Sequence, residues 1–189
     1  MNTKDLKSAL LVIDVQLGIF DDPRLKRKQE SEKALDETVA RIAGLIARAR
    51  DASTPVIFIQ HDGGKGDRLE AGTPGWQLRP ELGPRLDEPV IQKRACDAFF
   101  ETSLAAELSA RGIRHLIIAG CMTQYCIDTT VRRAVSLGYD IVLVADGHMT
   151  ADAGSLRFEQ IIAHHNSLLD GFDAGQHEVR VVPSSEISF

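Results

Sequence analysis

Apolar runs alternate with helical patterns along this chain of 189 residues. Several short runs are rich in β-branched residues and are continuously apolar, which is typical of strands buried on both faces of a sheet. Pro89–Ile91 is a weaker strand candidate of the same kind. The stronger candidates are Ala9–Ile13, Pro55–Ile59, Leu116–Ala119, Asp140–Ala145 and Val179–Val182.

Between most of these runs, apolar residues recur three and four positions apart, which predicts amphipathic helices. Gly112 and Gly138 stand where helix C-caps are expected, directly ahead of the next strand. The repeated order of strand and helix predicts one domain over residues 1–189, an α/β fold in which a mainly parallel sheet lies between two layers of helices. The predicted helices are Glu32–Arg50, Thr102–Arg111, Thr123–Leu137 and Leu156–Leu169.

Composition narrows the class of partner. The chain has 22 basic and 27 acidic residues and a net charge of -5, which gives no electrostatic reason to expect nucleic acid or an anionic membrane as a partner. No apolar stretch approaches the ~20 residues of a membrane span, and the leader Met1–Lys7 lacks the hydrophobic region of a secretory signal. Three cysteines without a C-x-x-C pair favour a reducing compartment over a disulfide framework or a zinc site. We therefore expect a cytoplasmic protein that binds a small molecule.

The stretch His61–Glu88 has little periodicity and is rich in glycine and proline. A loop of this length inside a compact domain is usually functional, often a lid, or else disordered. Trp76, the only tryptophan of the chain, lies within it. This position favours an ordered loop near the functional site.

Reactive side chains follow three of the predicted strands. Asp14 comes after the first strand, Lys93 after Pro89–Ile91, and the turn Gly120–Cys126 after Leu116–Ala119. In open parallel sheets ligands bind beyond the carboxyl ends of the strands, so these residues belong to one edge. Taken singly, each has an ordinary alternative: Asp14 as the cap of a turn, Lys93 as a solvated surface residue, and a cysteine as a small buried hydrophobe.

Together, these groups could support nucleophilic acyl transfer. A carboxylate can take the proton of a thiol, a neighbouring ammonium favours the anionic sulfur, and backbone N–H groups stabilise the oxyanion. Cys126 lies near the N-terminal end of a predicted helix, where the helix dipole favours a thiolate. Cys121, directly after Gly120, is expected to face the core.

Three segments occur in order along the chain: LLVIDVQLGIF, DAFFETSL shortly after Lys93, and AGCMTQYCIDTTVRRAVSLGYDIVLVADG. Together they resemble the isochorismatase-like cysteine hydrolases, which include nicotinamidases, N-carbamoylsarcosine amidohydrolases and ureidoacrylate amidohydrolases. The resemblance extends from about Ala9 to Ala163 and implies a Rossmann-like, six-stranded, mainly parallel sheet and a homodimer or homotetramer. It also implies a triad of Asp14, Lys93 and Cys126, because the nucleophile of this family is the cysteine of a T-x-x-C element.

The same resemblance implies a reaction. Asp14 acts as acid and base, Lys93 is its electrostatic partner, and a thioester on Cys126 forms as the C–N bond of a small amide, cyclic amide, carbamoyl or ureido compound is cleaved. A cis peptide between Cys121 and Met122 is implied as well, and it directs the N–H groups of Met122 and Cys126 at the oxyanion.

This chain differs from some members of the family that it resembles, and the differences bear on metal binding and on the substrate. Nicotinamidases hold a metal with an aspartate and several histidines near the second strand, whereas this chain has only His61 there. We therefore expect no metal and no cofactor. Side chains on loops after strands, or beside the nucleophile, are candidate substrate contacts, although each could serve loop packing or a subunit contact instead. These candidates are Phe20, Gln60, His61, Trp76 and Tyr125.

Three other functions remain open at this point. The thiol could serve redox sensing, or the fold could bind a ligand without catalysis. Alternatively, the chain could hydrolyse a vinyl ether as true isochorismatases do. The joint presence of Asp14, Lys93 and Cys126 favours the amidohydrolase, because a redox sensor needs no acid beside its thiol.

Overall fold

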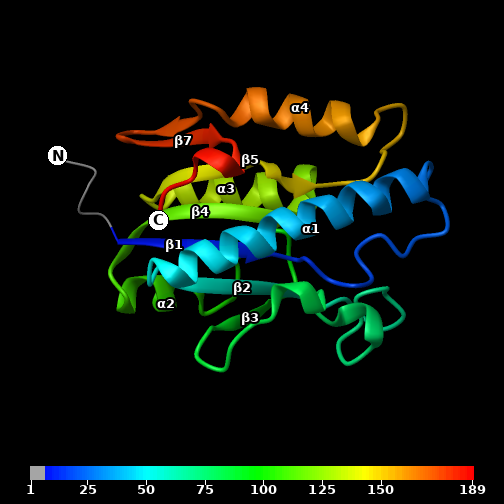
Figure 1. Ribbon diagram of the computed structural model, residues 1–189, viewed down its shortest axis with the longest axis horizontal. Coiled ribbons are helices and arrows are strands. Elements are labelled where there is room, and N and C mark those ends of the chain that lie inside the picture. Colours follow the sequence, from blue (N-terminus) through cyan, green and yellow to red (C-terminus); the bar gives the residue numbers. More distant parts are fainter. Residues whose placement is uncertain (1–6) are drawn as a thin grey trace.

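The computed structural model describes residues 7–189, so most of the leader Met1–Lys7 lies outside the described residues. Within this range, seven strands form one sheet in the order β3-β2-β1-β4-β5-β7-β6 (Figure 1). Neighbouring strands from β3 to β7 are all parallel, and β6 pairs antiparallel with β7. The strands are β1 Lys7–Ile13, β2 Val56–His61, β3 Val90–Lys93, β4 Ile113–Cys121, β5 Asp140–Met149, β6 Asp173–Ala174 and β7 His177–Val182.

The expected parallel sheet is therefore present, and β6 is the difference from the expected six strands. This strand has two residues, too few for any period to be visible in the sequence. The weak candidate Pro89–Ile91 corresponds to β3, an edge strand of four residues.

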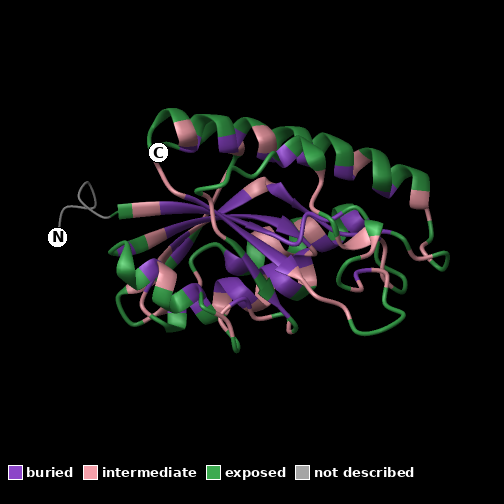
Figure 2. Ribbon diagram, turned by 90° about the horizontal axis from the view of Figure 1, so that it is seen from below, coloured by how far each residue is buried: buried purple, intermediate pink, exposed green. Residues whose placement is uncertain are grey.

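Helices cover both faces of the sheet, as predicted (Figures 1 and 2). α1, Lys28–Asp51, packs over one face, and α2, Leu104–Ala110, and α3, Asp128–Ser136, cover the other. α4, Phe158–Leu169, packs against β5 and β7. Successive residues of β1 alternate between these layers, as the strand period of two requires: Leu10 and Val12 join the cluster under α1, while Leu11 and Ile13 join the cluster under α2 and α3. No helix in residues 7–189 has the length and hydrophobicity of a membrane span.

The strand order reverses beside β1. The chain runs outward from β1 to β2 and β3, then returns to the opposite side of β1 to form β4. The connections that leave β1 and β4 thus diverge at the carboxyl ends of these strands, and ligands bind at such a point in sheets of this kind. Asp14 directly follows β1, and the segment Met122–Cys126 directly follows β4.

The long loop after β2 is ordered, as the position of Trp76 led us to expect. Its backbone is hydrogen-bonded to the segment that follows β1: Leu17 N donates to Gln77 O at 2.9 Å and Gly18 N to Gly75 O at 2.8 Å. These bonds hold the loop along the rim that carries Asp14.

We expect Gly120→Ala to prevent stable folding. Gly120 has a φ of +134°, and an added Cβ would lie 2.0 Å from Ile13 O, a backbone atom of the adjacent strand that cannot move aside. Such a clash at a positive φ is expected to lower the free energy of unfolding by ~3 kcal/mol or more. Chemical denaturation measures the loss. Gly44→Ala is the matched control, because its Cβ would meet nothing within 4 Å on an exposed face of α1. That change is expected to stabilise the helix by up to ~1 kcal/mol, and equal midpoints for the two variants would contradict this account.

Candidate active site

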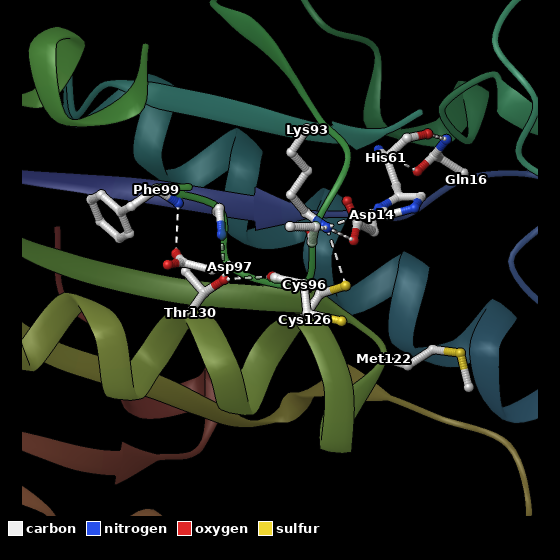
Figure 3. A network of polar contacts seen from close by, with 12 residues as sticks. Asp14, Gln16, His61, Lys93, Cys96, Asp97, Phe99, Met122, Cys126 and Thr130 are labelled. Atoms are coloured by element: carbon white, nitrogen blue, oxygen red, sulfur yellow. Dashed lines mark hydrogen bonds and ion pairs between the residues drawn. The ribbon is translucent and has the colours of Figure 1, made fainter. Parts of the chain in front are cut away.

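Asp14, Lys93 and Cys126 meet at the carboxyl ends of the strands (Figure 3). Lys93 Nζ lies 2.6 Å from Asp14 Oδ2 and 3.1 Å from Cys126 Sγ. Lys93 ends β3, and its side chain extends past β2 to reach Asp14 after β1 and Cys126 after β4. A third bond, from Nζ to Ala95 O at 2.9 Å, fixes the ammonium in place.

Burial governs the electrostatics of this cluster, since Asp14 is 1% and Lys93 is 2% exposed. Burial raises the pKa of the Asp14 carboxyl above its ordinary value, against the opposing effects of Lys93 and the Cys126 thiol. Burial alone would lower the pKa of Lys93, but the negative charge of Asp14 and the hydrogen bonds to Asp14 and Cys126 raise that pKa. Lys93 is therefore a permanent ammonium at neutral pH.

The resting state of Cys126 differs from the expectation of a helix-stabilised thiolate. Burial, followed by the negative charge of Asp14, raises the pKa of the Cys126 thiol well above its usual range, although Lys93 opposes this. These two effects outweigh the dipole of the short helical segment. The sulfur is thus a thiol at rest, and it needs a base to become a nucleophile.

Asp14 is placed to be that base. Its second oxygen, Oδ1, is buried and has no hydrogen-bond partner in residues 7–189. The residue has a φ of +51°, a left-handed conformation that aspartate tolerates better than most side chains. Asp14 N donates to Ile59 O at 2.9 Å, which ties the end of β1 to β2. A carboxylate with one oxygen bonded to an ammonium and the other free can accept the proton of the thiol.

A π-helical turn, Thr123–Ile127, carries Cys126 between β4 and α3. The predicted helix over Thr123–Leu137 therefore begins with this turn. Tyr125 N and Ile127 N both donate to Met122 O, at 3.0 and 3.3 Å. In the described part of the chain, neither Met122 N nor Cys126 N donates to a backbone carbonyl outside the turn. The peptide bond between Cys121 and Met122 is cis, as the resemblance implied.

The two neighbouring cysteines have different surroundings. Cys121 is fully buried in the hydrophobic core under α1, and burial raises the pKa of its thiol. Cys126 is 8% exposed and bonded to Lys93. The expectation that Cys121 faces the core is confirmed.

His61 is the candidate substrate contact that lies nearest to the triad. Its Nδ1 is 3.2 Å from Lys93 Nζ. An ammonium can only donate, so Nδ1 accepts and Nε2 carries the ring proton. Burial, and then the charge of Lys93, lowers the pKa of His61, which keeps the imidazole neutral. His61 therefore presents an N–H donor beside the triad.

Sequence reasoning missed Gln16, whose side chain holds the backbone of His61 in place. The fully buried Gln16 side chain donates to His61 O at 3.0 Å and accepts from His61 N at 2.9 Å. It also donates to Trp76 O at 2.8 Å. The available signal was a glutamine two residues after Asp14 within an otherwise apolar segment.

The other candidate contacts have different environments. Tyr125 is half exposed beside the nucleophile and is available to a ligand. Trp76 Nε1 donates to Asp62 Oδ1 at 2.6 Å, and Gln60 Nε2 donates to Trp76 O at 2.9 Å, so both side chains hold the loop. Phe20 is 3% exposed and packs in the core under α1. Phe20 thus packs in the core and Gln60 anchors the loop, and their roles as substrate contacts stay a prediction.

Asp14, His61 and Cys126 offer the only cluster of metal-ligand atoms within residues 7–189, and these atoms lie within 4.8 Å of one another. Lys93 Nζ is within hydrogen-bond distance of all three residues. A metal cation there would be repelled by this ammonium, so the charge distribution of the site opposes metal binding.

Comparisons with known proteins agree with this geometry. The isochorismatase domain model matches residues 8–163. A streptothricin hydrolase of Streptomyces noursei is 38% identical over 144 residues, which cover 76% of this chain and 50% of that protein. A ureidoacrylate amidohydrolase of Variovorax paradoxus is 34% identical over 174 residues, covering 74% of this chain and 67% of that protein.

A solved isochorismatase structure from Pseudomonas putida superposes with a TM-score of 0.84 at 31% identity, covering 96% of this chain and 90% of that one. A second streptothricin hydrolase of Streptomyces noursei also matches. The matched regions span only 50% and 55% of the lengths of these two hydrolases. The family model nevertheless covers most of the chain, and the fold agrees throughout. The chain therefore belongs to the isochorismatase family of hydrolases.

Proposed function

We propose that the protein is a cysteine hydrolase that cleaves a C–N bond of a small amide, cyclic amide, carbamoyl or ureido compound through a thioester on Cys126. The observation that carries this proposal is the position of the Lys93 ammonium, 2.6 Å from Asp14 and 3.1 Å from Cys126 in a buried site. The names of relatives, a streptothricin hydrolase and a ureidoacrylate amidohydrolase, support hydrolysis, and the second supports an amide-type bond.

In the first half-reaction, Asp14 Oδ1 takes the proton of Cys126, and the sulfur attacks the carbonyl carbon. Lys93 stabilises both the carboxylate and the developing thiolate. The N–H groups of Met122 and Cys126 then donate to the oxyanion, as free backbone donors do in acyl-transfer sites. Protonated Asp14 returns its proton to the departing nitrogen, and ammonia or an amine leaves.

In the second half-reaction, water attacks the thioester. Asp14 removes one proton from this water, the tetrahedral intermediate collapses to an acid, and the proton passes back to the sulfur. The elevated pKa of Asp14 suits both roles, because a carboxyl that titrates closer to neutral pH is a better proton acceptor and still a useful donor.

His61 and Tyr125 would contact the substrate in this scheme. The Nε2–H of His61 is a fixed donor beside the triad, and Tyr125 gives a half-exposed aromatic surface next to Cys126. Both features fit a small, planar, polar compound with a hydrogen-bond acceptor near its scissile carbonyl.

Ammonia release tests this proposal, with ring opening followed by mass spectrometry for the cyclic amides, whose nitrogen stays in the product. We expect turnover with at least one member of a panel of primary amides, cyclic amides, ureido acids and carbamoyl amino acids, and none with the Cys126→Ala protein. A vinyl ether substrate and peroxide-driven loss of the thiol are followed in parallel. Oxidation of Cys126 without turnover of any panel member would favour redox sensing, and hydrolysis of the vinyl ether alone would favour isochorismatase-type chemistry.

A further inference from the structure

We propose that a buried chain of side chains, Thr123–His148–Asn166, positions the backbone turn that supplies the oxyanion donors. The inference rests on the proposed function, and it assigns a role to a buried histidine that the triad does not use. Thr123 Oγ1 lies 2.9 Å from His148 Nδ1, and His148 Nε2 lies 2.8 Å from Asn166 Oδ1. These three residues act through the backbone and are positioning residues.

The donor and the acceptor of each hydrogen bond that links Thr123, His148 and Asn166 can be assigned. Asn166 Nδ2 donates to Ala145 O at 3.0 Å, which turns its amide oxygen toward the imidazole. His148 Nε2 must therefore carry the proton and donate to that oxygen. Nδ1 is then a bare acceptor, and the hydroxyl of Thr123 donates to it.

The surroundings keep the imidazole in this form. Thr123 is fully buried and His148 is 1% exposed. Burial lowers the pKa of His148 to about 4. The hydrogen bond to Asn166 and the charge of Asp146 oppose this lowering, and His165 adds to it. A protonated imidazole could not accept a hydrogen bond from the Thr123 hydroxyl. The bond between Thr123 and His148 therefore requires a neutral imidazole.

The chain links three elements that lie far apart in the sequence. Thr123 is the first residue of the π-helical turn, His148 lies on β5 opposite Gly120 of β4, and Asn166 lies on α4. The turn that begins at Thr123 is flanked by Met122 N and includes Cys126 N. A hydroxyl fixed at the first residue restricts both N–H groups, whereas the sulfur is held separately by Lys93.

This separation makes the inference testable without knowledge of the natural substrate. A small aldehyde such as acetaldehyde forms a hemithioacetal: the Cys126 sulfur adds to the carbonyl carbon, and the thiol proton moves to the oxygen. That oxygen would lie at the oxyanion donors. Iodoacetamide, in contrast, reacts with the sulfur by displacement of iodide and creates no oxyanion. The alkylation rate of Cys126 is measured at increasing aldehyde concentrations, and its decrease gives the aldehyde Kd. The alkylation rate without aldehyde measures the reactivity of the Cys126 thiol by itself.

The experiment uses a Cys96→Ser background, because Cys96 is exposed and would also be alkylated. We expect Thr123→Val to raise the aldehyde Kd at least tenfold while the alkylation rate stays within threefold. Thr123→Ser, which keeps the hydroxyl, should restore the Kd to within threefold. His148→Phe should match Thr123→Val, and the double variant should add little, since both changes break the bond between Thr123 and His148. If His148→Phe does not fold, the Thr123 pair decides the question.

Thr38→Val is the matched control, because Thr38 is a buried threonine whose hydroxyl bonds Ala34 O on α1, away from the site. Its Kd should equal that of the parent protein. An unchanged Kd in Thr123→Val would overturn the inference and leave the proposed function standing. A parallel change in alkylation rate would overturn it too, because the hydroxyl would then act on the sulfur. An absence of any aldehyde adduct in the parent protein would overturn both.

Discussion

Replacing Cys126 with alanine is expected to lower kcat by at least ~1000-fold, with the fold retained. The sulfur is the only thiol bonded to the Lys93 ammonium in residues 7–189, and no neighbouring group can form the thioester in its place. The change removes one sulfur atom from a buried position, so the loss of stability should be small, ~1 kcal/mol. Ammonia release and far-ultraviolet circular dichroism measure the two effects.

Cys121→Ala is the matched control for this change, because Cys121 lies five residues earlier and is fully buried. It should keep kcat within a few-fold and lower stability by ~1 kcal/mol, as expected for the loss of a small buried group. An inactive Cys121→Ala protein and an active Cys126→Ala protein would show that Cys126 is not the nucleophile.

The Asp14→Asn change is expected to reduce kcat by a similar factor, again at least ~1000-fold. An amide cannot accept the thiol proton, and burial, the largest cause of the raised pKa of Cys126, remains after the change. The change also leaves the ammonium of Lys93 buried without its carboxylate, so stability should fall, by ~3 kcal/mol or more for a broken buried pair. Lost turnover should persist at temperatures where the variant is fully folded.

Glu88→Gln separates the loss of a base from the loss of an ion pair. Arg50 donates two hydrogen bonds to Glu88, at 2.7 and 2.8 Å, in a partly buried pair outside the site. Its removal should lower the melting temperature and leave kcat unchanged. If Glu88→Gln lost as much activity as Asp14→Asn, general destabilisation would explain both results.

The pH profile of the unmodified enzyme offers an independent measure of Asp14. The carboxylate form is the base, so kcat/KM should fall as the pH drops through the pKa of Asp14. Because burial raises that pKa, the acid limb should lie above the ordinary value of 3.8. The limb should be absent from the residual activity of Asp14→Asn. A limb at or below 3.8 would contradict a buried carboxyl base.

The strand and helix pattern could be predicted because it depends on local periodicity. Continuous apolar runs such as Ala9–Ile13 can be buried only between two helical layers, and this fixes the fold class. The position of Asp14, Lys93 and Cys126 after three strands then predicted one shared edge, because parallel strands end on the same side of the sheet. The resemblance added which sulfur lies beside the lysine.

Other features depended on contacts between distant segments. Gln60, near the end of β2, bonds the carbonyl of Trp76, and Phe20, in the segment after β1, lies in the core. The same holds for the support that Gln16 gives to His61 and for the link from Thr123 to His148. A sequence pattern shows which residues are polar but not which partners meet them.

The sequence by itself thus determined the fold class, the edge of the sheet that carries the chemistry and the residue types available there. The tertiary structure decided their protonation. Lys93 reaches past an intervening strand, and the exclusion of water around it keeps Cys126 a thiol and raises the pKa of Asp14. The physical reason is that period and residue type are local properties, whereas burial and the distance between charges arise only when strand order brings remote segments together.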